Sequence, residues 1–374
     1  MNQPGQFEII ATDEGSSARL GRLQTAHGFI ETPVFMPVGS KGAIKTMNPA
    51  ELEGLGTSML LGNTYHLMIR PGVEVVEKCG GLHSFMGWER GILTDSGGFQ
   101  AFSLARLRKI TDEGVEFNSH YDGARLFLGP VEAMEIQRRM ASDIAMVLDE
   151  CAPYPCDHNY ACQAVERTLT WAFLCSRQPR AEGQLVFGIV QGGEYEDLRL
   201  SCANRLVEMN FDGYAVGGVS VGEPKDVLRR SVEFGVAGLP PEKPRYLMGV
   251  GIMSQIVDAV ADGIDMFDCV IPTRFARNGT AFTRRGRFPV KAGEYRLDTG
   301  PIEAGCECYA CRRFSRAYLR HLLNIDEVLG IHMLSLHNMH CYMQFMEEMR
   351  GSLRNGTFGD FRRKTKAERG EEER

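Results

Sequence analysis

The chain has 374 residues, of which 43% are hydrophobic and 24% charged, values typical of a globular protein and not of a disordered one. It contains no run of about 18 apolar residues and no signal-peptide pattern, so we expect a cytoplasmic protein with no membrane partner. Eleven cysteines are too few, and odd in number, for a disulfide framework; they favour core packing plus a metal site.

Short apolar runs of β-type sequence alternate with amphipathic segments from about residue 33 to residue 272. The candidate strands are residues 34–38, 59–63, 92–95, 143–149, 186–191, 213–218, 246–250 and 266–271. Candidate helices include residues 131–142, 160–177, 195–209 and 254–262. Continuous apolar strands indicate a parallel sheet covered on its faces, and eight such units favour an α/β fold, the (β/α)8 TIM-like barrel. An open dinucleotide-binding sheet is disfavoured because no Gly-x-Gly-x-x-Gly follows the first strand.

Two stretches depart from this alternation. Residues 115–128 alternate around Asp122-Gly123, a type I′ turn signal, and predict a β-hairpin in the third connection. After the eighth strand, about 40 residues replace the expected short loop. We therefore expect a catalytic barrel of residues 1–272 plus 315–360, an inserted basic subdomain of residues 273–314, and a disordered charged tail of residues 361–374. A long helix is predicted from residue 315 through residue 351.

Carboxylates stand at the ends of three predicted strands, where α/β barrels carry their chemistry. They are Asp95, Asp149 and Asp268. A single aspartate here is readily explained as a helix N-cap, but three at one mouth indicate paired carboxylates acting as nucleophile and general acid/base. Gln191 and Gly218 are the last residues of two further predicted strands; an amide and bare backbone suit the edge of a planar base, although glycine also serves turn geometry.

Three cysteines fall within six residues in the pattern Cys306-x-Cys308-x2-Cys311. In a reducing compartment this spacing indicates a zinc knuckle. The pattern leaves the fourth ligand open among His321, His332, His337, His340 and Cys341. A site closed by four protein ligands has no position for substrate, so the metal is expected to be structural.

The net charge of −6 conceals a basic stretch from Arg274 to Arg320. Its 47 residues contain eleven Lys and Arg against four Asp and Glu, a local charge of +7. A polyanionic partner fits this stretch, and a solvated basic surface is the alternative that charge alone leaves open.

Long motifs in the chain match one family. They are Asp95-Ser96-Gly97-Gly98-Phe99-Gln100, Asp149-Glu150-Cys151-x-Pro153-Tyr154-Pro155, Phe187-Gly188-Ile189-x-Gln191-Gly192, residues 212–218, residues 246–251, Asp265-Met266-Phe267-Asp268-Cys269, Pro272-Thr273-Arg274-x-x-Arg277-Asn278-Gly279, and the cysteine knuckle followed by Leu336-His337-Asn338. In unbroken order over roughly residues 20 to 350, they resemble bacterial tRNA-guanine transglycosylases of the queuine tRNA-ribosyltransferase family. The resemblance implies a TIM-like barrel with a zinc-binding subdomain after the eighth strand.

The implied activity is that of a pentosyltransferase of queuosine biosynthesis. It exchanges guanine at the anticodon wobble position for 7-aminomethyl-7-deazaguanine (preQ1) by double displacement, without ATP. By similarity, Asp268 is the nucleophile that holds the tRNA covalently, and Asp95 is the general acid/base.

The resemblance also assigns binding residues. The residues implied to bind the base are Asp149, Gln191, Gly218, Ser96, Phe99, Cys151, Val221, Met248 and Glu223, with Phe99 and Met248 on either side of the ring. Arg274 and Arg277 match positions that contact RNA next to the flipped base. His337 matches the fourth ligand of one structural Zn²⁺.

The implied partners are tRNAs with GUN anticodons (those for aspartate, asparagine, histidine and tyrosine), the preQ1 base, and a second copy of the chain in a homodimer. Ser220 stands where many bacterial members have Ala, and Phe99 where some have Tyr. Eukaryotic members, which take the bulkier queuine, have Gly at the position of Val221 and Val at that of Cys151. The branched Val221 therefore predicts a preference for preQ1.

Three rival interpretations are weaker. A barrel hydrolase with a metal-activated water would need His and carboxylate ligands at the barrel mouth, where the sequence offers only His66. A non-catalytic RNA-binding subunit would be expected to lack the Asp95 and Asp268 motifs, which are present. Archaeal relatives that modify the tRNA core carry additional C-terminal RNA-binding domains, which we do not expect in this chain.

Overall fold

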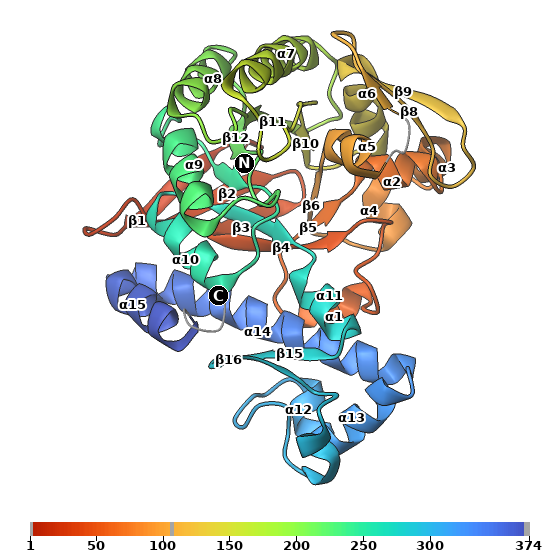
Figure 1. Ribbon diagram of the computed structural model, residues 1–374, viewed down its shortest axis with the longest axis vertical. Helices are drawn as coiled ribbons and strands as arrows, with labels where there is room; N and C mark the ends of the chain where they lie inside the picture. The colour runs from red at the N-terminus through yellow and green to blue at the C-terminus, as the bar shows by residue number, and fades with distance from the viewer. Residues whose placement is uncertain (1–2, 105–107, 370–374) are drawn as a thin grey trace.

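The computed structural model describes residues 3–104 and 108–369, and a closed parallel barrel forms its centre (Figure 1). The strands follow one another around the barrel in the order β10-β11-β12-β13-β14-β4-β5-β6. Their bounds are β4 Val34–Gly39, β5 Met59–Gly62, β6 Gly91–Thr94, β10 Ile144–Met146, β11 Leu185–Val190, β12 Gly213–Val216, β13 Arg245–Leu247 and β14 Met266–Cys269. The barrel closes where β14 pairs with β4, with Met266 opposite Val34. The predicted TIM-like fold is confirmed.

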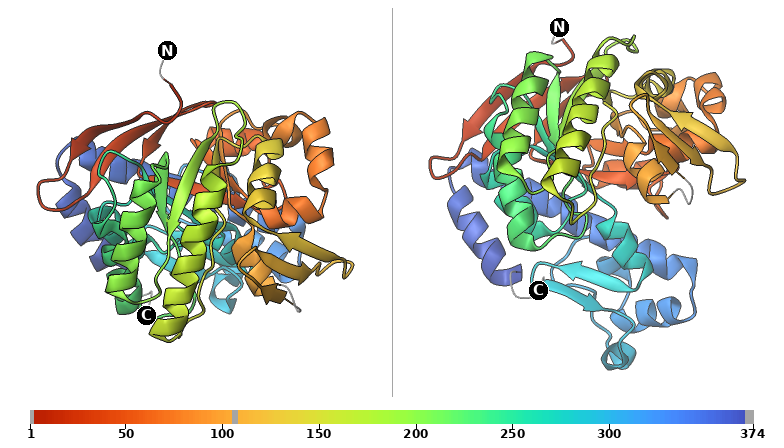
Figure 2. Two further views of the ribbon diagram at one scale, coloured as in Figure 1. Left: turned by 90° about the horizontal axis from the view of Figure 1, so that it is seen from above. Right: turned by 45° about the horizontal axis from the view of Figure 1, so that its top comes forward.

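Helices surround the barrel and connect its strands (Figure 2). They are α1 Pro49–Gly54, α2 Thr64–Ile69, α3 Val73–Lys78, α4 Gly81–Met86, α5 Gly98–Leu104, α6 Pro130–Met140, α7 His158–Ser176, α8 Glu196–Glu208, α9 Lys225–Ala237, α10 Met253–Ala261 and α11 Ile271–Arg277. The four helices predicted from periodicity correspond to α6, α7, α8 and α10. Asp157 caps α7 by accepting the N–H of Tyr160 at 2.8 Å, which fixes where this helix begins.

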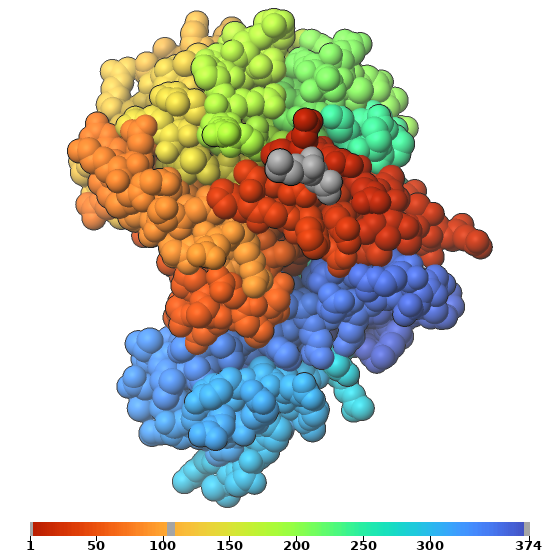
Figure 3. All heavy atoms as spheres, turned by 180° about the vertical axis from the view of Figure 1, so that it is seen from behind, coloured from red at the N-terminus to blue at the C-terminus, as the bar shows by residue number. Residues whose placement is uncertain are grey.

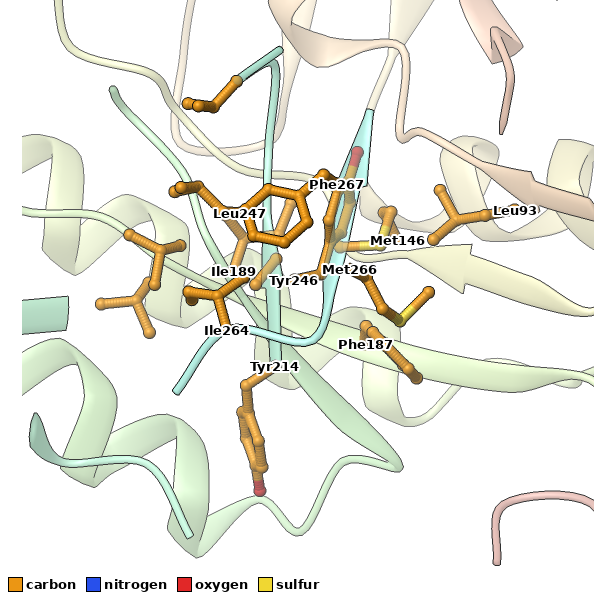
Figure 4. Close-up of a cluster of buried hydrophobic side chains, with 14 of the residues drawn as sticks. Leu93, Met146, Phe187, Ile189, Tyr214, Tyr246, Leu247, Ile264, Met266 and Phe267 are labelled. Atoms are coloured by element: carbon orange, nitrogen blue, oxygen red, sulfur yellow. The ribbon is translucent and has the colours of Figure 1, made fainter. Parts of the chain in front are cut away.

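Large apolar side chains fill the barrel (Figure 4). Met146, Phe187 and Met266 come from three different strands and are completely buried. Burial of each such side chain contributes about 1.5–3 kcal/mol to the free energy of unfolding. This packing holds the strand ends, and the side chains that follow them, in fixed positions.

An antiparallel sheet that the sequence did not predict covers the N-terminal ends of the barrel strands. Its strands are β1 Phe7–Thr12, β2 Arg19–Thr25 and β3 Gly28–Thr32. The guanidinium of Arg19 donates to both carboxylate oxygens of Asp265, at 2.9 and 2.6 Å, and the carboxylate of Asp265 is fully buried. Seen from behind, the sheet borders the C-terminal helices (Figure 3).

The predicted hairpin is present, but its turn differs from the prediction. β8 (Val115–Asn118) pairs with β9 (Arg125–Leu128), and β7 (Arg108–Ile110) adds a third strand. Residues 119–124 connect β8 to β9, and only Gly123 of the Asp122-Gly123 pair has a positive φ. The prediction of a type I′ turn is therefore wrong, because that turn requires a positive φ at both central residues.

The segment after β14 forms a small lobe beside the barrel (Figure 1). It consists of α11, the hairpin β15 (Thr280–Thr283) and β16 (Gly286–Pro289), the 3-10 helix η1 (Gly293–Leu297), α12 (Tyr309–Arg313) and α13 (Arg316–Asn324). The predicted long helix is interrupted: α13 ends at Asn324 and α14 runs from Val328 to Arg354, because Asp326 between them adopts a φ of 54°.

The expected disordered tail is wrong for most of its length. Residues 361–369 belong to α15 (Phe358–Arg369), and residues 370–374 lie outside the described residues. Phe361 packs against Phe345 of α14 with ring centroids 5.5 Å apart, and Arg362 and Lys366 form ion pairs with Asp258. Tertiary contacts therefore order a segment whose composition alone suggested disorder.

In the part of the chain that the structure describes, no helix combines the length and the apolarity needed to span a membrane.

Candidate active site and metal centre

Asp95 directly follows β6 and is held by donors from the segment after β5 and from its own loop. Its Oδ1 accepts the N–H of Thr64 at 2.9 Å and that of Gly97 at 3.1 Å, and Asn63 donates to Oδ2. The pKa of Asp95 is raised to about 7, mainly by burial and also by the charges of Asp268 and Asp149, while the hydrogen bonds from Thr64 and Gly97 act in the opposite direction. Asp95 can therefore hold or release a proton near neutral pH.

Asp268 lies on β14 and is fixed through one of its two oxygens. Oδ1 accepts the hydroxyl of Tyr246 at 2.5 Å and the N–H of Gly249 at 2.7 Å. Oδ2 receives no hydrogen bond from the described residues. Burial raises the pKa of Asp268, while these two hydrogen bonds lower it. One carboxylate oxygen is thus anchored by two donors, and the other is free of hydrogen bonds from the described residues.

Asp149 and Gln191 form a polar pair at the same end of the barrel. The Nε2 of Gln191 donates to Oδ2 of Asp149 at 2.6 Å, and burial raises the pKa of Asp149 to about 6. Oε1 of Gln191 is buried without a partner among the described residues. A Cβ on Gly217 would stand 2.8 Å from Nε2 of Gln191, so the glycine makes room for this side chain.

Glu150 points away from the site, although it is adjacent to Asp149 in sequence. Its Oε1 accepts the hydroxyl of Tyr160 at 2.8 Å, and Arg167 pairs with Oε2. This buried glutamate is therefore accounted for by structural partners.

Arg199 on α8 is completely buried beneath the two glycine loops and donates to backbone carbonyls. Its three contacts are Nε to the oxygen of Gly193 at 2.6 Å, and the terminal nitrogens to those of Gly217 at 3.1 Å and Gly218 at 3.2 Å. Burial lowers the pKa of this guanidinium to about 10. Arg199 thus ties the loop after β11 to the loop after β12.

Glu223 accepts hydrogen bonds from the backbone of the segment that follows Gly218. Ser220 and Val221 both donate their backbone N–H groups to its carboxylate, the second at 2.8 Å. Ser220 adopts a φ of 60°, the left-handed region that a non-glycine residue rarely occupies. A cavity borders Val221 and Gly218 and is also lined by Ala152, Pro153 and Tyr154. Glu223 therefore fixes the orientation of two consecutive peptide planes beside this cavity.

The remaining predicted site residues surround these groups. Ser96 is buried and hydrogen-bonds Asp149, and burial raises the pKa of Cys151 to about 12. Phe99 is exposed on α5, and Met248, which follows β13, is half-buried. On α11, Arg274 is exposed and Arg277 half-buried.

Three cysteines of the lobe and one histidine of α14 form a cluster that could hold a metal ion: Cys306, Cys308, Cys311 and His337. Nδ1 of His337 lies 3.7, 3.4 and 3.4 Å from the three sulfurs, in that order. Its Nε2 lies 2.7 Å from the carbonyl of Phe282 and donates to it, which leaves Nδ1 as the ligand atom. Of the candidates that the sequence left open, the cluster selects His337.

A second group of metal-type ligands lies at the opposite end of the barrel. His27 Nδ1 and His83 Nε2 contact different oxygens of Asp143, at 2.9 and 3.0 Å. The same oxygens also accept the backbone N–H groups of His27 and Ile92, so hydrogen bonds already satisfy this buried carboxylate. At the barrel mouth, His66 belongs to no metal-ligand cluster of the described residues.

Sequence reasoning missed the residues that position the carboxylates. Tyr246 contacts Asp268 across 22 positions and Asn63 contacts Asp95 across 32. Arg199 contacts Gly193 only six positions away, but it reaches Gly217 and Gly218 across 18 and 19 positions. Tyr246 lies two residues before Met248 in the motif of residues 246–251, so the alternation of a strand places the two side chains on the same face. This alternation was the signal in the sequence that could have identified Tyr246.

Comparisons with known proteins agree with the resemblance seen in the motifs. A family model described as queuine tRNA-ribosyltransferase matches residues 13–371. The queuine tRNA-ribosyltransferase of Lysinibacillus sphaericus is 52% identical over 364 residues, which cover 97% of this chain and 96% of the relative. Those of Pelotomaculum thermopropionicum (54% over 356 residues, 95% and 96% covered) and Bacillus subtilis (51% over 361 residues, 96% and 95% covered) are equally similar. The chain therefore belongs to the queuine tRNA-ribosyltransferase family of transferases.

Proposed function

We propose that the protein is a tRNA-guanine transglycosylase of queuosine synthesis that replaces guanine at the wobble position of GUN-anticodon tRNAs with preQ1. The observation that carries this proposal is the pairing of an anchored Asp268, with one oxygen left unbonded by the described residues, and a neighbouring Asp95 of pKa about 7. These are the two roles that a double displacement at an anomeric carbon requires.

In the first step, Oδ2 of Asp268 attacks the anomeric carbon of the wobble nucleotide as the glycosidic C–N bond breaks. Protonated Asp95 gives its proton to the departing guanine. In the second step, ionised Asp95 takes a proton from preQ1, whose ring nitrogen attacks the same carbon and releases Asp268. The raised pKa of Asp95 supports this alternation, because both of its forms are populated near neutral pH.

The polar wall of the site supports recognition of a guanine-like base. Asp149 is suited to accept from the base's N–H groups, while Gln191 and the backbone at Gly218 read its carbonyl edge. Phe99 and Met248 are proposed to lie on either side of the ring, with Ser96 and Cys151 completing the pocket. The N–H of Ser220 and the carbonyl of Val219 belong to the same peptide plane, so the hydrogen bond from Ser220 to Glu223 also orients this carbonyl. The carbonyl of Val219 is proposed to accept from the aminomethyl ammonium of preQ1.

The cysteine–histidine cluster is proposed to hold one structural Zn²⁺. Zinc bonds of about 2.3 Å to sulfur and 2.0 Å to nitrogen in a tetrahedron place sulfur and nitrogen about 3.5 Å apart. The observed separations of 3.4–3.7 Å match this value. When bound, the ion would cross-link the lobe, and the four ligands leave no position for substrate.

A homodimer is proposed as the working form. The lobe and the adjoining start of α14 expose large apolar side chains, with Leu297 85%, Val328 65% and Ile325 58% exposed. Such a concentration on one lobe is typical of a protein–protein interface. Light scattering should give twice the chain mass of 41.6 kDa; an active species of the single-chain mass would contradict this proposal.

Trapping the covalent intermediate tests the mechanism. Enzyme mixed with unmodified tRNA and preQ1, then denatured, should yield an enzyme–RNA adduct by mass spectrometry, and Asp268→Asn should abolish it while tRNA binding persists. Asp262→Asn is the matched control, since burial also raises the pKa of Asp262, to about 6, but this residue precedes β14 at the other end of the barrel. Persistence of the adduct in Asp268→Asn would overturn the assignment.

A further inference from the structure

The hairpin loop that follows β8 presents an aromatic ring flanked by two cations. The guanidinium carbon of Arg70, at the end of α2, lies 4.5 Å from the ring centroid of Tyr121, and Nζ of Lys41, in the loop after β4, lies 5.2 Å from it. The ring of His120 lies 4.2 Å from the same ring. Three loops at the mouth of the barrel thus converge on Tyr121.

The positive charges around Tyr121 are not neutralised by ion pairs. Lys41 and Arg70 are exposed, and neither has a carboxylate within ion-pair distance among the described residues. Asp122 lies in the same loop, but the carboxylate accepts from the hydroxyl of Ser119 and from the N–H of Ala124, which lower its pKa more than Arg70 does. In a chain of net charge −6, two unpaired cations held against one ring form a local anion-binding surface.

This surface is continuous with the arginines proposed to contact RNA. Burial lowers the pKa of Lys45, and the next largest causes are the charges of Arg277, Lys41 and Arg274. Lys41 and the two arginines of α11 thus all lie close enough to Lys45 for their charges to act on it. The basic surface extends from α11 to the hairpin loop.

The same surface is built onto the wall of the active site. The hydroxyl of Tyr65 lies 2.9 Å from Nδ1 of His120, and the two rings are stacked with centroids 5.6 Å apart. Tyr65 is buried, and it follows Thr64, whose N–H is donated to Asp95. The flanking nucleotides of an RNA strand that delivers its base to Asp95 must pass close to this wall.

We propose that Lys41 and Arg70, held in place by the ring of Tyr121, bind backbone phosphates of the RNA strand next to the exchanged nucleotide. This inference rests on the proposed function and adds a phosphate contact site to it. The two cations supply N–H donors and charge, and Tyr121 restricts their positions through its π-face. A phosphate contact depends on charge and not on base sequence, so it would form equally with every acceptor tRNA.

The test measures binding of an RNA hairpin with the sequence of the anticodon arm, by fluorescence anisotropy in the absence of free base. Lys41→Gln and Arg70→Gln should each weaken binding about three- to tenfold at about 0.1 M salt and reduce the slope of log Kd against log salt by about 0.7–1. Tyr121→Leu should weaken binding, whereas Tyr121→Phe, which keeps the ring face, should retain most of the wild-type affinity.

Arg180→Gln is the matched control, since it removes one positive charge beside Asp212 at the opposite end of the barrel. Unchanged affinity and salt slope in Lys41→Gln and Arg70→Gln would overturn the inference. So would variants that lose self-association in light scattering but keep RNA affinity, because the surface would then bind protein. If the wild type binds the hairpin but exchanges no base, the proposed function fails, while the phosphate contact is still decided by the affinities.

Discussion

The hydroxyl of Tyr246 donates a 2.5 Å hydrogen bond to Oδ1 of Asp268, from the neighbouring strand of the barrel. The N–H of Gly249 donates to the same oxygen. Both donors lower the pKa of a carboxylate that burial raises. Tyr246 therefore orients the carboxylate and also favours its ionised form.

Tyr246→Phe should separate these two effects from packing, because the ring remains. The pKa of Asp268 rises when a donor to its ionised form is lost, so the acid limb of the profile of kcat/KM against pH should move to higher pH. At neutral pH, adduct formation should slow about tenfold, as expected for one hydrogen bond to a charged group worth about 1.5 kcal/mol. Tyr214→Phe is the control, as Tyr214 is buried on β12 away from Asp268. A profile unchanged by Tyr246→Phe would contradict this role.

The contribution of Asp95 to the free energy of unfolding should decrease as the pH rises. Its folded pKa of about 7 lies above the ordinary aspartate value of about 3.9, so the native state binds the proton more tightly than the unfolded state. This contribution to the free energy of unfolding is fully present below about pH 4 and is lost as the pH rises through 7. Asp95→Asn should therefore stabilise the protein more at pH 8 than at pH 5, measured by urea midpoints. An equal effect at both pH values would show that Asp95 is not held protonated.

Arg199 is expected to be a positioning residue for base recognition. Arg199→Met removes the side-chain donor from three backbone carbonyls, of which that of Gly217 is buried and would cost about 1–3 kcal/mol, and it frees the loops that carry Gln191 and Gly218. The KM for the free base should rise about tenfold or more, with a smaller change in kcat, and Arg199→Lys should recover part of the loss. Arg245→Met is the control: Arg245 is also buried and also donates to a backbone carbonyl, that of Leu239, at the other end of the barrel. If the melting temperature falls equally in both and the KM changes in neither, Arg199 is only structural.

Removal of the metal should weaken the lobe before the barrel. Cys308→Ala or a strong chelator should lower the zinc content, the melting temperature and the affinity for tRNA together, because the lobe carries much of the basic stretch. Cys175→Ala, a buried cysteine outside the cluster, should lower only the melting temperature, by about the cost of a small cavity. Atomic absorption that finds no zinc in freshly purified protein would rule out the proposed ion.

Val221 should set the size of base that the site accepts. Val221→Gly enlarges the space beside the cavity lined by Ala152 and Tyr154, so the ratio of kcat/KM for preQ1 to that for queuine should fall markedly. Ser220→Ala should leave this ratio high, because the hold of Glu223 on the backbone does not depend on the hydroxyl. Equal use of both bases by the wild type would contradict the steric argument.

The sequence was sufficient for the barrel strands because each is an apolar run buried on both sides. It placed several strand ends too late: β10 stops at Met146, three residues before Asp149. The N-terminal sheet escaped prediction because β1 is half exposed and β2 contains glycine and two arginines, of which Arg19 is buried against Asp265 and the carbonyls of Pro241 and Lys243. Such a partner, 246 positions away, has no local signal.

The candidate site shows the same division. Strand ends identified Asp95, Asp149 and Asp268 without any structure, since topology alone brings such positions together. The partners that tune them, Tyr246 and Asn63, depend on side-chain directions across neighbouring strands. Charge patterning found the basic stretch but missed Lys41 and Arg70, which only folding places beside it.

Helix α14 links the metal cluster to the catalytic end of the barrel. His337 belongs to the cluster, while the side-chain amide of its neighbour Asn338 bonds the carbonyls of Pro272 and Thr280 and accepts the N–H of Phe282. The lobe is consequently not an interchangeable module. A chimaera that grafts residues 273–324 from a relative onto this barrel would separate the three cysteines from α14, the helix that supplies His337 and Asn338. Exchange of lobes between family members should succeed only when α14 is exchanged together with the lobe.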